Sequence, residues 1–379
     1  MRADPGFRKE GVLQIHLETR NMHLQTLIKS KERPFLITGP CSAETREQVL
    51  QVCDDIAANG NADMLRAGIW KPRTRPDSFE GVGEPGLEWL VEAGKRTGLP
   101  VTTEIANAKH AESALKAGIS VLWIGARTTV NPFAVQDIAD ALRGTGIPVM
   151  IKNPVNPDLN LWLGAFERFQ KAGLTDLAAI HRGFSVYNHP KYRNVPSWEL
   201  PIGLKENMPE IPIICDPSHI TGRRDLLLEV SQKAMDLNMD GLMIETHPDP
   251  DHAWSDAAQQ VTPEGLKNLL SHLVLRSSVV EDALSQELAE MRQQIGLLDD
   301  RLFEMLSARM KLSEKVGIFK RRNKVTILQE DHWKKVIDSR LEKSDEMFLT
   351  PQFVRNVMDN IHQESIRHQT RVMNPDLKK

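Results

Sequence analysis

The first 277 residues contain eight short apolar runs that recur at near-regular intervals. Each run is four to six residues long, and most are separated by stretches with an amphipathic helical pattern. The runs cover residues 35–38, 62–67, 101–105, 121–124, 149–152, 178–181, 211–215 and 241–245. Continuous apolar strands that alternate with helices are typical of a parallel sheet that is buried on both faces.

Eight strand–helix units within about 240 residues predict an α/β fold, a closed (β/α)8 TIM barrel. A doubly wound open sheet is the alternative, but no G-x-G-x-x-G motif follows the first run. In a barrel of this kind, catalytic side chains lie where the strands end and the following loops begin. The polar residues at the ends of the runs are therefore the candidates for chemistry.

The last hundred residues have a different character. Only two of the 23 glycines and two of the 22 prolines fall in residues 278–379, where Glu, Lys, Arg, Leu and Met predominate. This composition favours long helices. We expect an all-α domain of three helices, over residues 281–322, 329–343 and 350–371, with Thr350 as an N-cap and Pro351 in the first turn.

The expected domains are a barrel over residues 33–276 and a helical domain over residues 277–379, with no flexible Gly/Ser tract between them. Residues 1–32 are expected to be an N-terminal leader or extension. Within them, the alternation of Leu13, Ile15 and Leu17 indicates at most one added strand.

Composition and charge narrow the class of protein. The 48 basic and 51 acidic residues give a net charge of −3, whereas nucleic-acid-binding proteins usually have a basic excess. The chain has no apolar run of 18 residues and no apolar signal-peptide core. Its three cysteines cannot form a disulfide framework. We therefore expect a cytoplasmic enzyme that binds neither nucleic acid nor membranes.

Four of the candidate side chains suit a metal ion. Cys41 follows the first run, His219 follows the seventh, Glu245 ends the eighth, and Asp256 lies 11 residues beyond Glu245. One thiolate, one imidazole and two carboxylates together favour a divalent transition metal. Taken singly, Cys41 could be a small buried side chain and His219 a loop residue. Their shared position at the ends of predicted strands favours a site.

Cationic side chains gather at the same predicted barrel face. They are Arg66, Lys71, Arg73, Arg127, Lys152 and Arg182. A chain of nearly balanced charge gains nothing from this concentration unless an anionic ligand offsets the repulsion. Phosphates and carboxylates are the obvious candidates.

These segments resemble the type Iβ class of 3-deoxy-D-arabino-heptulosonate 7-phosphate (DAHP) synthases. The matching segments are GPCSAE (39–44), LRAGIWKPRTRP (65–76), IGAR (124–127), IKNP (151–154), HRGFS (181–185), DPSH (216–219) and IETHPDP (244–250), with SD at 255–256. They follow the expected order from about residue 33 to residue 275. The KPRT segment and the four metal positions are the most specific.

The resemblance implies condensation of phosphoenolpyruvate with erythrose 4-phosphate, with release of phosphate, at the entry to aromatic biosynthesis by the shikimate pathway. It makes Cys41, His219, Glu245 and Asp256 the metal ligands, with Mn²⁺ expected first and Fe²⁺, Co²⁺ or Zn²⁺ as alternatives. The positions that match phosphoenolpyruvate binding are Arg66, Lys71, Arg127, Lys152 and Arg182, and those that match erythrose 4-phosphate binding are Arg73 and Thr74. We expect Lys71 to donate a proton to the new alkoxide, with a pKa lowered by burial among other cations.

The C-terminal helices resemble the all-helical chorismate mutase family. Arg292, Arg309 and Lys320 have the family spacing, and Ser365 and Gln369 match a pair on the last helix. The resemblance implies rearrangement of chorismate to prephenate. Lys320 and Gln369 would donate hydrogen bonds to the ether oxygen, and the other three would hold the carboxylates.

Arg292 and Arg309 cannot bind the same small ligand from one chain. Seventeen helical residues separate them by about 25 Å along the axis and place them on different faces. Arg309 and Lys320 share a face, and Ser365 and Gln369 are an i, i+4 pair. We therefore expect Arg292 to complete the site of a second chain in a homodimer formed through the helical domain. A tetramer is the higher alternative.

One part of the mutase resemblance is incomplete. The family usually has an acidic residue and an Arg–Glu pair early in the second helix, where this chain has Gln329, His332 and Trp333. A shift of one or three residues would bring in Asp331 or Glu330. The alternative function of the helical domain is therefore that of an allosteric sensor or dimeriser with weak mutase activity.

The sequence as a whole predicts a bifunctional enzyme in which chorismate or prephenate, bound to the helical domain, regulates the barrel. One rival is the eight-carbon sugar-phosphate synthase that uses arabinose 5-phosphate. The KPRT segment and the mutase-like tail argue against it. The other rival is a binding protein without metal chemistry, which the complete metal and cation sets disfavour.

Overall fold

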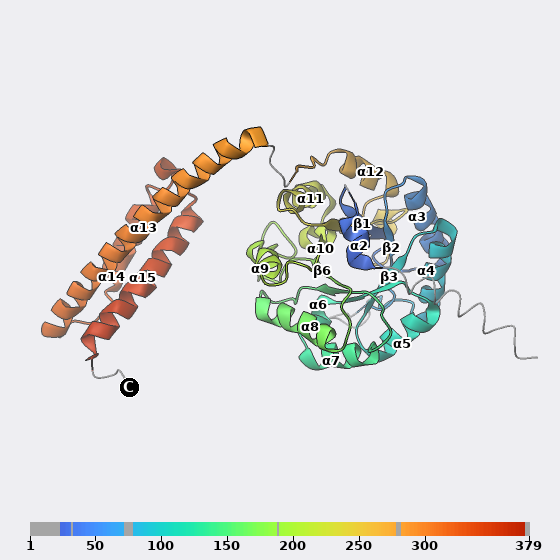
Figure 1. The fold of residues 1–379 in the computed structure, drawn as a ribbon, viewed down its shortest axis with the longest axis horizontal. Coiled ribbons are helices and arrows are strands. Elements are labelled where there is room, and N and C mark those ends of the chain that lie inside the picture. The colour runs from blue at the N-terminus through green and yellow to red at the C-terminus, as the bar shows by residue number, and fades with distance from the viewer. Residues whose placement is uncertain (1–22, 32, 72–78, 188, 278–281, 376–379) are drawn as a thin grey trace, which may run out of the picture. The chain divides into compact units, whose positions relative to one another are not determined.

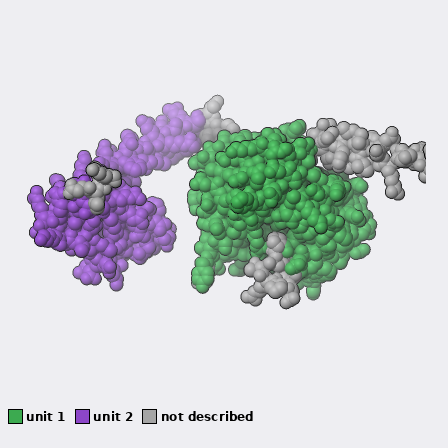
Figure 2. All heavy atoms as spheres, turned by 90° about the horizontal axis from the view of Figure 1, so that it is seen from below, with its two compact units in different colours: residues 1–278 green, residues 279–379 purple. Residues whose placement is uncertain are grey.

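The computed structural model describes residues 23–31, 33–71, 79–187, 189–277 and 282–375. The strand expected around Leu13 lies outside these ranges. The chain divides into two compact units, residues 1–278 and residues 279–379, which we call the barrel unit and the helical unit (Figure 2).

Eight parallel strands close into a barrel in the order of the sequence, which confirms the expected fold (Figure 1). The strands are β1 (Phe35–Gly39), β2 (Met64–Arg66), β3 (Val101–Ile105), β4 (Val121–Ile124), β5 (Val149–Lys152), β6 (Leu177–His181), β7 (Ile213–Cys215) and β8 (Gly241–Glu245). β1 pairs with both β2 and β8, and this pairing closes the sheet.

Helices follow the strands of the barrel, and the longer ones cover its outer face (Figure 1). They are α3 (Arg46–Ala58), α4 (Glu84–Thr97), α5 (Ala108–Ala117), α6 (Ala126–Thr129), α7 (Pro132–Ala141), α8 (Leu159–Lys171), α9 (Glu199–Asn207), α10 (Pro217–Thr221), α11 (Leu227–Asp236) and α12 (Pro263–Ser271), with short 3₁₀-helices η2 (Arg224–Leu226), η3 (Pro250–His252) and η4 (Ala257–Gln259). Alternate strand residues such as Ile37, Trp123 and Met243 form an interior cluster, and their neighbours, such as Leu36 and Leu122, belong to the cluster that packs against the helices.

A short helix that no sequence pattern indicated, α2 (Leu24–Lys29), packs onto the barrel interior. Its Leu24 and Ile28 are buried and belong to the interior cluster. Asp176, the residue before β6, accepts hydrogen bonds from the backbone N–H groups of Leu24 and Gln25 at 2.6 and 3.0 Å. Because Asp176 precedes its strand, α2 lies at the barrel end opposite to the carboxyl ends of the strands. A helix of six residues is too short to show a helical period in the sequence.

The helical unit consists of α13 (Asp282–Arg322), α14 (Glu330–Leu341) and α15 (Pro351–Met373), with η5 (Asp345–Met347) between the last two. These are the three expected helices. Thr350 caps α15 as expected, because its side-chain oxygen accepts a hydrogen bond from the backbone N–H of Phe353. Gly317 lets α13 approach α15 closely, since a Cβ at this position would lie 3.0 Å from the Cα of Gln369. None of the described helices is both long and apolar enough to cross a membrane.

Candidate functional site

The strand ends bring the four candidate metal ligands to the carboxyl end of the barrel. Cys41 follows β1, His219 lies in α10 directly after β7, Glu245 ends β8, and Asp256 precedes η4. The side chains form two close pairs. Cys41 Sγ lies 3.4 Å from Asp256 Oδ2, and His219 Nε2 lies 3.7 Å from Glu245 Oε1.

The two pairs do not together surround a common point as the ligands of one metal ion would. Over the ranges that the structure describes, no group of three or more His, Cys, Asp or Glu side chains is positioned to hold a metal ion. Two cations stand next to the candidate ligands instead: Lys71 Nζ donates to Cys41 Sγ at 3.0 Å, and Arg66 Nη2 lies 3.1 Å from Glu245 Oε1.

The donor chemistry nevertheless fits a divalent transition metal. Burial raises the pKa of the Cys41 thiol to about 12, so metal binding would have to release its proton. Burial also raises the pKa of Glu245, but the cations Arg66 and Lys71 act against burial and the net shift is downward, so Glu245 is ionised. A mixed sulfur, nitrogen and oxygen set suits Mn²⁺, Fe²⁺, Co²⁺ or Zn²⁺ better than it suits Ca²⁺ or Mg²⁺.

Asp216, which was not predicted as a site residue, lies directly after β7 and contacts two of the predicted ones. Its Oδ2 lies 2.8 Å from His219 Nδ1 and 3.2 Å from Lys152 Nζ. Burial lowers the pKa of His219, so its imidazole is neutral. The carboxylate beside Nδ1 favours the proton there, which leaves the Nε2 lone pair on the side of Glu245.

The predicted cation cluster contains carboxylates of its own. Arg66 and Lys152 are buried beside the ring of Trp123, with Arg66 Cζ 5.0 Å and Lys152 Nζ 5.5 Å from the ring centroid. The Trp123 indole donates a hydrogen bond to Glu104 Oε2 at 2.8 Å. Glu104 and Asp216 therefore offset part of the repulsion between these cations without any ligand, which the positions of the cations in the sequence did not predict.

The remaining predicted cations differ in their surroundings. Arg182, directly after β6, is half-buried, and its Nη1 donates to Asn194 Oδ1 at 2.7 Å. Burial lowers the pKa of Arg182 to about 10. Arg127 lies in α6, directly after β4, and is exposed. Arg73 and Thr74 lie outside the described residues.

The pKa of Lys71 departs from the expectation. Neighbouring cations were expected to lower it, and burial and Arg66 do act in that direction. Cys41, once its thiol is ionised, and the Glu245 carboxylate outweigh them, so the pKa of Lys71 is raised. The expected direction was therefore wrong. Lys71 keeps its proton near neutral pH, and a proton donor needs that state.

Two further contacts hold the loop that carries Asp256. Arg193 Nη1 lies 2.8 Å from Asp256 Oδ1, and the spacing of the predicted site residues gave no sign of this ion pair. Glu44 accepts a hydrogen bond from the backbone N–H of Trp254 at 2.8 Å and lies 3.2 Å from His247 Nε2. The Glu44 contacts join the loop after β1 to the loop after β8, and the Arg193 ion pair joins that second loop to the segment after β6.

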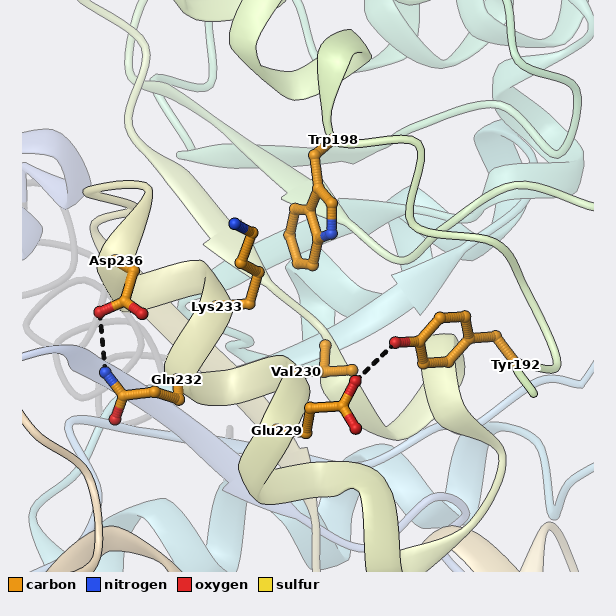
Figure 3. Close-up of a pocket in the computed structure, with 7 residues that line it drawn as sticks. All are labelled: Tyr192, Trp198, Glu229, Val230, Gln232, Lys233 and Asp236. Carbon is orange, nitrogen blue, oxygen red and sulfur yellow. Dashed lines mark hydrogen bonds between the residues drawn. The ribbon is translucent and has the colours of Figure 1, made fainter. Parts of the chain in front are cut away.

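A cavity of about 370 Å³ lies away from the predicted site residues, beside α11 on the outside of the barrel (Figure 3). It is lined by Tyr192, Trp198, Glu229, Val230, Gln232, Lys233 and Asp236. Its acidic groups already have partners, because the Tyr192 hydroxyl donates to Glu229 at 2.8 Å and the Gln232 amide donates to Asp236 at 2.9 Å. The cavity therefore shows no unpaired acidic group, and its lining includes none of the predicted site residues at the strand ends.

In the helical unit, four of the five candidate mutase residues lie along the contact between α13 and α15. Arg309 donates a hydrogen bond to the Ser365 hydroxyl, and Gln369 lies against Gly317, one turn from Lys320. Lys320, Ser365 and Gln369 are only 9%, 4% and 9% exposed. Gln369 Oε1 is buried and has no hydrogen-bond partner among the described residues.

Two observations bear on the rest of the mutase resemblance. Arg292 is exposed on α13, 17 residues before Arg309, so it lies apart from the other four candidate residues. Near the start of α14, Trp333 stacks on His362 of α15 with 3.7 Å between ring centroids, while Asp331 is exposed. An aromatic ring, not a carboxylate, therefore packs against α15 here.

Comparison with known proteins agrees with both parts of the chain. The DAHP synthetase I family model matches residues 14–281, and the chorismate mutase type II model matches residues 291–370. The chain is 32% identical over 238 residues to a phospho-2-dehydro-3-deoxyheptonate aldolase of Thermotoga maritima, covering 63% of this chain and 68% of that protein. It is 28% identical over 278 residues to a 2-dehydro-3-deoxyphosphooctonate aldolase of Cupriavidus necator, covering 65% and 92%.

Solved structures show the same likeness. The crystal structure of the Thermotoga maritima phospho-2-dehydro-3-deoxyheptonate aldolase (DAHP synthase) matches with a TM-score of 0.57 and 30% identity, covering 62% of this chain and 67% of that one. A truncated form of 3-deoxy-D-arabino-heptulosonate 7-phosphate synthase from the same organism matches with a TM-score of 0.54 and 26% identity, covering 69% and 87%. With more than half of its length matched by the first family model, the chain belongs to the DAHP synthetase I family and, through its chorismate mutase type II domain, is a bifunctional enzyme of the shikimate pathway.

Proposed function

We propose that the barrel unit condenses phosphoenolpyruvate with erythrose 4-phosphate, and that this reaction needs a divalent metal held by Cys41, His219, Glu245 and Asp256. The observation that supports the proposal most is the closeness of a thiol, an imidazole and two carboxylates to buried cations at the strand ends. Mn²⁺ is the first candidate metal, with Fe²⁺, Co²⁺ and Zn²⁺ as alternatives.

Each set of side chains has a distinct role in this reaction. When bound, the metal would supply a Lewis acid for the aldehyde. Arg66, Lys152 and Arg182, together with Arg127, hold the phosphate and carboxylate of phosphoenolpyruvate through charge-assisted hydrogen bonds. Arg73 and Thr74 hold the phosphate of erythrose 4-phosphate.

Lys71 would supply the proton that neutralises the alkoxide formed together with the new carbon–carbon bond. The enol carbon attacks the aldehyde carbon, and the aldehyde oxygen becomes an alkoxide that takes a proton from the Lys71 ammonium. The raised pKa of Lys71 supports this role, because the side chain remains protonated before the reaction. Water then adds to the carbon that bears the phosphate, and phosphate departs.

For the helical unit, the proposed activity is the rearrangement of chorismate to prephenate. Lys320 and Gln369 donate to the ether oxygen, and Arg309 and Ser365 hold a carboxylate. The burial of these polar side chains in the contact between α13 and α15, and the partnerless oxygen of Gln369, support a ligand site there.

A second copy of the chain supplies Arg292 to that site. Along α13, apolar side chains recur every three or four residues, and Leu298, Leu302 and Met305 are 61%, 53% and 72% exposed. A helix with such an exposed stripe buries it against a partner. We therefore infer a homodimer formed through the helical unit, with a tetramer as the higher alternative.

Trp333 favours a second candidate role for the helical unit. Its stacking on His362 leaves the start of α14 without a carboxylate directed at α15. The unit then acts mainly as a sensor that binds chorismate or prephenate and regulates the barrel, with weak mutase activity. In either case, the enzyme works in the cytoplasm.

Two assays on the full chain test these proposals. Formation of DAHP from the two substrates should be lost in Cys41→Ala and retained in Arg309→Met. Consumption of chorismate should be retained in Cys41→Ala and lost in Arg309→Met. Replacing erythrose 4-phosphate by arabinose 5-phosphate should lower turnover strongly. Equal or faster turnover with the five-carbon sugar would favour the eight-carbon synthase instead.

A further inference from the structure

Asp216 is buried among the predicted site residues at the strand ends. It contacts both a candidate metal ligand, His219, and a candidate phosphoenolpyruvate-binding residue, Lys152. It is the last residue before α10 and is 0% exposed. Its Oδ1 accepts a hydrogen bond from the backbone N–H of His219 at 3.1 Å. Its Oδ2 faces both His219 Nδ1, at 2.8 Å, and Lys152 Nζ, at 3.2 Å.

We propose that Asp216 is a positioning residue that links metal binding to phosphoenolpyruvate binding, by orienting His219 and Lys152 through the same carboxylate oxygen. This inference rests on the proposed synthase function and adds the residue that joins its two binding half-sites.

On the side of His219, Asp216 controls both the backbone and the ring. The capping hydrogen bond fixes the first turn of α10. The charge of Oδ2, 2.8 Å from Nδ1, favours the ring proton on that nitrogen, although the two atoms are not aligned as a hydrogen bond. Nε2 is then the free lone pair, and it lies toward Glu245. Carboxylates that hold a ligating histidine in this way typically contribute 10–100-fold to metal affinity.

On the side of Lys152, the same oxygen fixes a buried ammonium group. Lys152 ends β5 and is 3% exposed, with the face of the Trp123 ring 5.5 Å from Nζ, and its charge also lowers the pKa of Glu104. Removing the carboxylate would leave a buried cation without its ion-pair partner, so Lys152 would have to move or lose its proton. In either case, phosphoenolpyruvate would lose a correctly placed cation.

Asp216→Asn tests both effects with little change in shape. Asn can keep the cap through Oδ1, but its Nδ2 would be a donor facing the donors on His219 and Lys152. Titration with Mn²⁺, read from the electron spin resonance of the free ion, should give a Kd raised at least tenfold. At saturating Mn²⁺, the KM for phosphoenolpyruvate should rise at least fivefold, with a smaller change in the KM for erythrose 4-phosphate.

Asp240→Asn is the matched control. Asp240 accepts the backbone N–H of Ile213 at 2.8 Å and lies 3.9 Å from Lys205 Nζ, so it also pairs with one N–H and one lysine beside β7. It precedes β8 and therefore lies at the opposite barrel end from Asp216. This variant should keep the wild-type Mn²⁺ Kd and the wild-type KM for phosphoenolpyruvate.

The outcomes separate this inference from the proposed function. If wild-type protein forms DAHP and Asp216→Asn leaves either the Mn²⁺ Kd or the KM for phosphoenolpyruvate within twofold of wild type, the link through Asp216 is overturned and the synthase function stands. If wild-type protein forms no DAHP, the synthase function fails, and an unchanged Mn²⁺ Kd would also overturn the role of Asp216 toward His219. Should Asp216→Asn not fold, Asp216→Ser retains a capping oxygen and is held to the same criteria.

Discussion

At the scale of single residues, the charge at the strand ends depends on partners from distant parts of the chain. The predicted cations Arg66 and Lys152 are offset by Glu245 and Asp216, and Asp256 is held by Arg193. The residue types at the strand ends could be predicted, because the (β/α)8 pattern fixes where strands end. The internal pairs could not, since a carboxylate in a sequence looks the same whether it binds a ligand or a neighbouring side chain.

His181 predicts a specific dependence of stability on pH. It is fully buried beside Trp198 and Phe184, and neither ring nitrogen has a hydrogen-bond partner among the described residues. Burial lowers the pKa of His181 from 6.5 to about 3. The unfolded chain therefore binds more protons between these values, so stability is complete above pH 6.5 and falls as the pH drops toward 3.

The substitution His181→Phe should remove this acid sensitivity, because the new ring keeps the aromatic contacts and cannot be protonated. Between pH 7 and pH 5, the free energy of unfolding should fall by about 2 kcal/mol more in wild type than in the variant. Urea unfolding followed by tryptophan fluorescence measures this, since six of the seven tryptophans lie in the barrel unit. His272→Gln, at an exposed position, should behave as wild type, and equal pH dependence in wild type and His181→Phe would refute the explanation.

At the scale of elements, the regular helices and strands were predictable and the short ones were not. The eight strands and the long helices α13 and α15 show clear periods or compositions. α2, with six residues, shows neither, and its place depends on Leu24 and Ile28 entering the interior cluster and on Asp176 accepting its N–H groups. Such contacts are tertiary and leave no local pattern.

The exposed stripe on α13 predicts how the helical unit associates. A charge at Leu298 should prevent burial of the stripe, so Leu298→Asp should convert the proposed dimer into a monomer in sedimentation equilibrium. Chorismate turnover should fall at least tenfold, because Arg292 then no longer completes a site, while DAHP formation persists. Gln293→Asp, which lies on α13 away from the stripe, should remain dimeric. A Leu298→Asp protein that is still a dimer would show that another surface forms the interface.

At the scale of the whole molecule, two units with separate chemistry share one chain. The second unit acts on, or binds, compounds formed after the product of the first. Binding there can regulate the barrel only if chorismate or prephenate has a different affinity for two states of the enzyme.

Regulation through the helical unit predicts that saturating prephenate changes the rate of DAHP formation by the full chain at least twofold. Arg309→Met should abolish the response and leave the basal rate unchanged, because Arg309 lies in the helical unit and contacts Ser365. Lys311→Met, at an exposed position on α13, should respond as wild type. A wild-type rate that prephenate does not alter would remove the regulatory role.

The proposed metal site of the barrel is tested most directly by measuring phosphate release from phosphoenolpyruvate and erythrose 4-phosphate before and after treatment with a chelator. We predict that release requires both substrates, is lost after the metal is removed, and returns when Mn²⁺ is added to wild type but not to Cys41→Ala. Undiminished release by the chelated protein, or full recovery of Cys41→Ala with Mn²⁺, would contradict a metal site built from Cys41, His219, Glu245 and Asp256.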